Sequence, residues 1–107
     1  MKVLFLGQYS HDGRKGLRDS TLAKRKEVAG ALAETVGGTL HDLFFVRGDI
    51  DVVAIGDMPD EETTLAFRDI LMESGAWENF EVMMEIDIAK MNAAFSKIGG
   101  YKAPGSE

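Results

Sequence analysis

The stretch that decides the fold is TLHDLFFVRGDIDVVAIGD, residues 39–57. It holds two apolar runs, TLHDLFFV and IDVVAIGD, and both are rich in residues that favour β-strands. Gly48-Asp49 lies between the runs and fits a two-residue hairpin turn, because glycine accepts a positive φ at the first central position. The sequence therefore predicts an antiparallel hairpin with these pairs: Arg47 with Ile50, Phe45 with Val52, and Leu43 with Ala54.

The chain before the hairpin predicts one strand and one helix. KVLFLGQY (2–9) is typical of a strand, and SHDGRKG (10–16) is typical of a loop. Asp19 or Ser20 can cap a helix that ends at Gly37-Gly38. Apolar residues repeat at helical spacing inside it: Val28, Ala29, Leu32, Ala33 and Val36.

The chain after the hairpin predicts a second helix, a fourth strand and a short last helix. Pro59 suits the first position of the second helix, which Gly75 ends. Residues 78–86 form the fourth strand, and Asp87 caps the last helix. The order β-α-β-β-α-β, followed by a helix, is the ferredoxin-like α+β arrangement, with an antiparallel sheet and two helices on one face.

Both faces of the predicted hairpin are apolar. Side chains alternate between the faces of a strand. One face would hold His41, Leu43, Phe45, Arg47, Ile50, Val52 and Ala54. The other would hold Leu40, Asp42, Phe44, Val46, Asp51, Val53 and Ile55. Two helices cover only one face of such a sheet, so a monomer would expose the second face to water. Each large apolar side chain left exposed there loses a burial free energy of ~1.5–3 kcal/mol. We therefore expect a homodimer or higher homo-oligomer that pairs through this sheet face.

The composition is that of one small globular domain. The chain has 107 residues, of which 45% are hydrophobic and 28% charged. We expect a domain over residues 1–99 and a C-terminal tail over 100–107. No cysteine is present, which excludes thiolate chemistry and makes the cytoplasm the expected compartment. No apolar run approaches the ~20 residues that cross a bilayer, so no membrane partner is expected.

Several short stretches resemble one known family. These are GQYSHDG after the first strand, GGTLHDLFFVRGDIDVVAIGDMPD in the middle, SGAW after the second helix and YKAPG at the end. Together they make residues 3–105 similar to the GYD domain family of small, functionally uncharacterised bacterial proteins. The resemblance implies a ferredoxin-like fold of the dimeric α/β-barrel kind and no known reaction.

The signature of that family is a glycine, a variable residue, then Tyr-Asp. The matching residues are Gly48, Asp49, Ile50 and Asp51. Ile50 stands where tyrosine is usual, so a role of the tyrosine hydroxyl does not carry over to this chain. Asp51 has two interpretations. Burial would raise its pKa and make it an acid or base, or it binds backbone N–H groups at the hairpin end or an arginine of a partner. We favour the structural interpretation.

A ligand pocket is predicted between the sheet and the helices. Tyr9, His11, Arg47 and Trp77 would line it, as aromatic groups with a few polar ones line most small-molecule sites. Core or interface packing explains the same residues equally well. His11 and His41 lack metal-ligand spacing, so we expect no metal site. The sequence does not indicate which cofactor, if any, the protein binds.

Three functions are compatible with these residues. The first, which we favour, is an oligomeric small-molecule-binding or structural protein without catalysis. The second is a small cofactor-free or haem-linked enzyme of the monooxygenase or isomerase kind, by analogy with other dimeric α/β barrels. The third is phosphate or nucleic-acid binding through the basic stretch 14–26. The net charge of −6 and the lack of aromatic residues in IDVVAIGD argue against nucleic acid.

Overall fold

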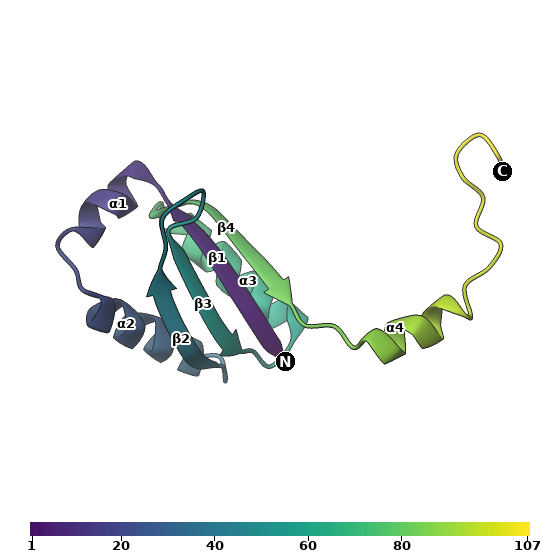
Figure 1. The fold of residues 1–107 in the computed structure, drawn as a ribbon, viewed down its shortest axis with the longest axis horizontal. Helices are drawn as coiled ribbons and strands as arrows, with labels where there is room; N and C mark the ends of the chain where they lie inside the picture. The colour runs from purple at the N-terminus through teal and green to yellow at the C-terminus, as the bar shows by residue number, and fades with distance from the viewer.

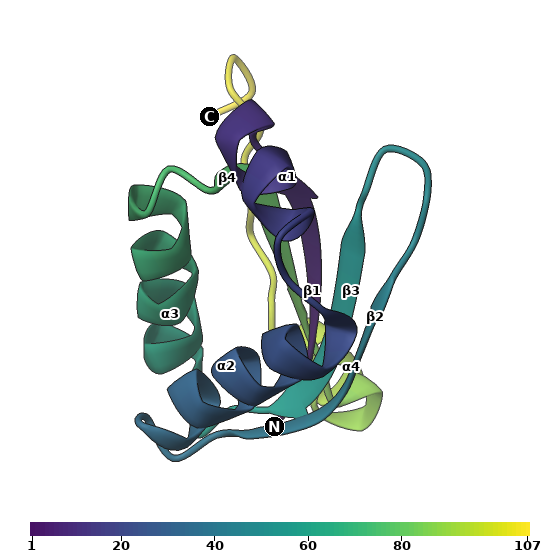
Figure 2. The same cartoon turned by 90° about the vertical axis from the view of Figure 1, so that its left-hand side faces the viewer.

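The computed structural model describes residues 1–107. Eight elements follow one another: β1 (Lys2–Tyr9), α1 (His11–Leu17), α2 (Leu22–Glu34), β2 (Thr39–Phe45), β3 (Val52–Asp57), α3 (Glu61–Glu73), β4 (Trp77–Met84) and α4 (Ile88–Phe95). The four strands form one antiparallel sheet in the order β2-β3-β1-β4. Helices α2 and α3 cover the same face of it (Figures 1 and 2). The predicted ferredoxin-like α+β fold is therefore confirmed.

The core lies between the sheet and these two helices. Alternate residues of β1 point into it, so Val3, Phe5 and Tyr9 are buried while their neighbours are more exposed. Phe80 of β4 and Met58 join Val3 and Phe5 in one apolar cluster. Tyr9 forms a second cluster with Leu43 and Val52. We call this helix-covered side the inner face of the sheet.

The strand pairing of the hairpin is confirmed in part. Phe45 is paired with Val52, and Leu43 with Ala54. The two-residue turn is wrong, because β2 ends at Phe45 and β3 begins only at Val52.

The backbone around Asp51 explains this wider loop. Its carbonyl accepts from the amide of Val46 (2.8 Å), and its own N–H donates to the carbonyl of Gly7 in β1 (2.9 Å). The loop end is thus bonded to β1 as well as to β2. Arg47 and Ile50 lie beyond this closing pair and do not form the predicted ladder pair.

A β-bulge at His41 shifts part of strand β2. Leu40 pairs with Gly56 and Asp42 with Ile55, so His41 has no direct partner. The bulge turns Leu40 onto the inner face, where it packs against the second cluster. Its predicted place on the outer face is therefore wrong. The cause is one extra residue that alternation alone does not reveal.

Three helix starts also differ from the sequence interpretation. The predicted loop over residues 10–16 is helix α1, because the Ser10 hydroxyl caps it by accepting from the amide of Gly13 (3.1 Å). Thr21, rather than Asp19 or Ser20, caps α2. Asp60 caps α3, so Pro59 precedes the cap instead of taking the first helical position. In each case the boundary is set by the residue whose side-chain oxygen accepts a hydrogen bond from one of the first free amides of the helix.

The C-terminal arm, residues 86–107, lies outside this body (Figure 1). Asp87 caps α4 as predicted, accepting from the amides of Ala89 and Lys90. The helix buries no residue, and its apolar side chains are exposed. None of the helices combines the length and apolar character that a bilayer crossing demands.

Two glycines of α1 should respond in opposite ways to alanine. A Cβ at Gly13 would lie 2.1 Å from the carbonyl oxygen of Ala76, whereas one at Gly16 would meet nothing within 4 Å. We expect Gly13→Ala to lower the free energy of unfolding by roughly 1–3 kcal/mol through overpacking. Gly16→Ala should raise it by about 0.5–1 kcal/mol. Urea unfolding measures both, and equal effects would contradict the close packing of α1 on Ala76.

Candidate functional site

An aromatic stack marks the end of strand β1. The rings of Tyr9 and Trp77 lie 4.1 Å apart at an angle of 17°. Phe80 meets Trp77 edge-on, with centroids 4.9 Å apart. Gly7 leaves room for this arrangement, because a Cβ there would lie 2.4 Å from the Trp77 ring. The aromatic residues therefore pack at one end of the inner face.

A cavity of about 90 Å³ extends from this stack along the inner face, between α2 and α3. Its walls are almost entirely apolar. Helix α2 contributes Val28, Ala29 and Leu32, the sheet contributes Phe5, Leu43 and Val52, and α3 contributes Phe67 and Leu71. The cavity lies between the sheet and the helices, where the sequence analysis placed its candidate ligand pocket.

An open basin of about 450 Å³ adjoins the cavity. Helix α1 with Asp12, Ser20 in the connection to α2, and the segment 74–76 form its more polar walls. Tyr9 and Arg25 line both the basin and the cavity. These two residues therefore stand where an apolar interior meets a polar entrance.

Tyr9 is a buried residue, with a relative exposure of 7%. Burial raises the pKa of its phenol, the nearby guanidinium of Arg25 lowers it in part, and the charge of Asp51 adds to the rise. The hydroxyl therefore stays protonated at neutral pH. Arg25 is half-buried, and no carboxylate lies within ion-pair distance of it.

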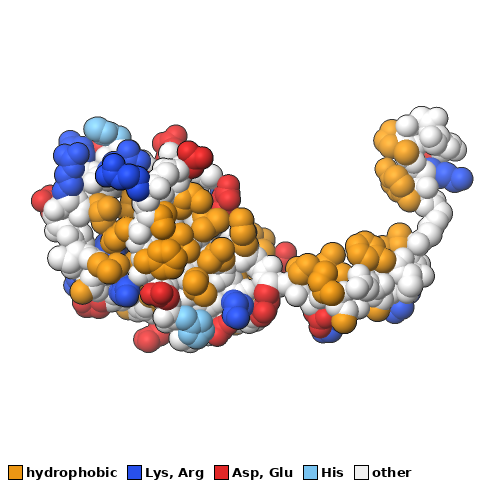
Figure 3. Space-filling view, viewed as in Figure 1, with side chains coloured by type: hydrophobic (Ala, Val, Ile, Leu, Met, Phe, Trp, Pro, Cys, Tyr) orange, Lys and Arg blue, Asp and Glu red, His pale blue; other side chains and the backbone are white.

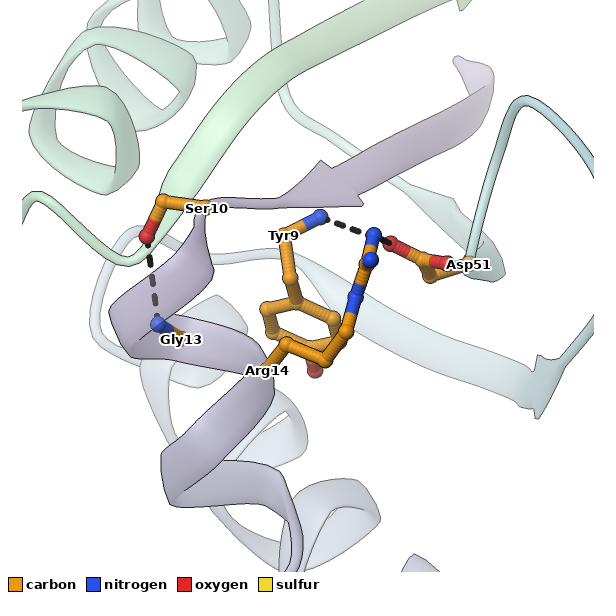
Figure 4. Close-up of polar contacts among 5 residues, drawn as sticks. All are labelled: Tyr9, Ser10, Gly13, Arg14 and Asp51. Atoms are coloured by element: carbon orange, nitrogen blue, oxygen red, sulfur yellow. Dashed lines mark hydrogen bonds and ion pairs between the residues drawn. The ribbon is translucent and has the colours of Figure 1, made fainter.

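Asp51 fastens the hairpin loop to the end of β1 (Figure 4). Its Oδ2 accepts from the backbone N–H of Tyr9 (2.9 Å) and lies 3.3 Å from the guanidinium of Arg14. This agrees with the structural interpretation of the motif aspartate, except that the arginine belongs to the same chain. The motif thereby holds Tyr9 in place without entering the cavity.

The structure brings together two of the four predicted pocket residues. Tyr9 and Trp77 stack and line the cavity, whereas His11 and Arg47 are exposed and line neither the cavity nor the basin. Arg25, which the sequence analysis placed only in the basic stretch 14–26, also lines both the cavity and the basin. The helical spacing is the signal for this position. Arg25 precedes Val28 and Ala29 by three and four residues, so it lies on the same side of α2 as the apolar stripe.

Neither histidine belongs to a metal-ligand cluster. His41 Nε2 lies 2.6 Å from Asp57 Oδ2, a hydrogen bond that holds the pKa of Asp57 below its usual range. No group of three or more His, Asp or Glu side chains is placed to hold a metal ion.

The sheet order, the two helices on one face and the cleft between them define a ferredoxin-like α+β protein with a small internal cavity. The chain belongs to the GYD domain family, whose model matches residues 4–95. Comparison with curated proteins and with solved structures found no match.

The stability of the protein should fall at alkaline pH because of Tyr9. Its pKa is raised above 10.0 in the fold, so its contribution is present below the unfolded pKa and is lost as pH rises through the folded pKa. We expect Tyr9→Phe to reduce this alkaline loss in urea unfolding, and Tyr101→Phe, at an exposed position, to leave it unchanged. An identical pH dependence in wild type and Tyr9→Phe would contradict the burial of the hydroxyl.

Removing the Asp51 carboxylate should destabilise the fold. Asp51→Ala leaves the Tyr9 N–H without its acceptor, which costs roughly 1–3 kcal/mol in the free energy of unfolding. Asp49→Ala, in the same loop but exposed, is the matched control and should change little. Equal stability of the two variants would show that the contact with Tyr9 contributes nothing.

Proposed function

We propose that this GYD domain protein is a homo-oligomer that binds a small molecule between its sheet and its helices. The observation that carries the proposal is the two-part shape of the site. An apolar cavity opens past Tyr9 and Arg25 into a polar basin. Apolar walls with a few convergent polar groups are typical of small-molecule sites.

The size of the cavity sets the size of the ligand. An engineered apolar cavity of roughly 150 Å³ binds benzene, and this one measures about 90 Å³. Helix α2 buries only Ala33, so little packing opposes a small outward shift of this helix. A compact body of about one ring therefore fits with a small adjustment.

The alternative of a small cofactor-free or haem-linked enzyme would use Asp51 as an acid or base. Asp51 instead bonds to the Tyr9 amide and Arg14, outside the cavity. These contacts favour binding over catalysis as the proposal for this site.

The outer face of the sheet supports the oligomer. It presents the apolar side chains Leu4, Leu6, Phe44, Val46, Val53, Ile55 and Met83. Figure 3 views this side of the sheet and shows an apolar surface over the strands with charged side chains around it. A second copy offers the same surface, so a two-fold pair would cover both at once.

Blocking the cavity should abolish binding of small apolar probes. We expect indole or benzyl alcohol to raise the melting temperature of the wild-type protein, since a ligand of the folded state stabilises it. Ala29→Phe places a ring among the cavity walls and should remove the shift, whereas Ala31→Phe, on the exposed side of α2, should keep it. No shift with any probe, or an equal shift in both variants, argues against the cavity as a site.

A charge on the outer face should separate the copies. Light scattering should give about twice the mass of one chain for the wild type, and Ile55→Glu should reduce it to one. Ile70→Glu is the control, because Ile70 is an exposed apolar residue of α3 and lies away from this face. A wild type that is monomeric at micromolar concentration would refute the pairing.

A further inference from the structure

Arg25 occupies an unusual position for a charged residue. It is half-buried at the mouth of an apolar cavity, while the other four arginines at positions 14, 18, 47 and 68 lie outside the cavity lining. Placing a charge against apolar walls is costly unless a partner of opposite sign is present.

No carboxylate of the chain supplies that partner. Asp51, whose charge reaches Tyr9, lies 3.3 Å from Arg14 instead. Asp12 lines the outer basin, and Asp57 lines the cavity but bonds to His41; neither is within ion-pair distance of Arg25. The guanidinium of Arg25 is therefore free to pair with an anion from outside the chain.

We infer that the cavity binds small organic acids, with one carboxylate against Arg25 and the Tyr9 hydroxyl and a compact apolar body among Val28, Ala29 and Trp77. This inference rests on the proposed function and names its ligand class. A planar guanidinium matches the two oxygens of a carboxylate. The protonated Tyr9 hydroxyl is a donor that an anion can accept from.

The surroundings favour a monocarboxylate over a phosphate. Arg25 is the only cationic side chain that lines the cavity or the basin, and Asp12 in the basin wall repels a second negative charge. The apolar walls favour an aromatic or branched short-chain acid over a hydrophilic one.

Benzoate and benzamide test the inference, because they share one ring and differ in charge. With the full-length protein in calorimetric titration at neutral pH, we expect benzoate to bind at least tenfold more tightly than benzamide. Arg25→Gln should abolish this preference, whereas the control Arg18→Gln, outside both cavity and basin, should retain it. Tyr9→Phe should weaken benzoate binding more than benzamide binding. Raising the salt concentration should narrow the preference in the wild type.

The other possible outcomes refute either the acid specificity alone or the binding of any ligand in the cavity. Equal affinity for benzoate and benzamide, or an unchanged preference in folded Arg25→Gln, refutes the acid specificity and leaves binding in the cavity standing. Inorganic phosphate competing as well as benzoate also refutes it. Failure of benzoate, benzamide and indole alike to bind refutes both this inference and the proposed function. If Arg25→Gln does not fold by circular dichroism, Arg25→Lys keeps the charge without the planar fork and should give an intermediate preference.

Discussion

The stacking of Tyr9 on Trp77 is the interaction on which the site depends. It joins the last residue of β1 to the first residue of β4, and the register of these strands shifts next to it. Ser10 follows at once and caps α1, while its own amide donates to the carbonyl of Ala76. The ends of these strands, the start of α1 and the junction of cavity and basin therefore lie next to one another. The Asp51 carboxylate bonds to the Tyr9 amide there from the hairpin loop.

The placement of both packed helices on one face of the sheet produces both the cavity and the exposed apolar surface. Two helices lie on one face of a four-stranded sheet and leave the other without cover (Figures 1 and 2). Only 12 of 107 residues are buried, so a lone chain has a modest core. Helices α2 and α3 each pack on an edge strand of the sheet, and the space between them is what remains open as the cavity.

Sequence patterns predicted the features that depend on regular spacing. The four strands in their order along the chain and the pairing of Phe45 with Val52 follow from alternation and turn residues. The place of Tyr9 and Trp77 between sheet and helices follows from analogy with related folds. Features that depend on one side-chain contact were missed. The Ser10 hydroxyl makes a helix of a glycine-containing stretch that is typical of a loop, and the extra residue at His41 leaves no mark in the hydrophobic pattern. Arg25 was assigned only to the basic stretch 14–26 because its charge suggests solvent, although its spacing places it on the apolar stripe of α2.

The bulge at His41 also has a consequence for the edges of the sheet. An edge strand can recruit a strand of another molecule only along an uninterrupted run of free amides and carbonyls. The bulge breaks that run on β2, and the opposite edge, β4, carries Glu78 and Glu81 and is followed by Glu85. A strand added to either edge would meet a broken ladder or a row of like charges. Fibril-like growth from edge to edge is thereby disfavoured, although the chain exposes a broad apolar sheet.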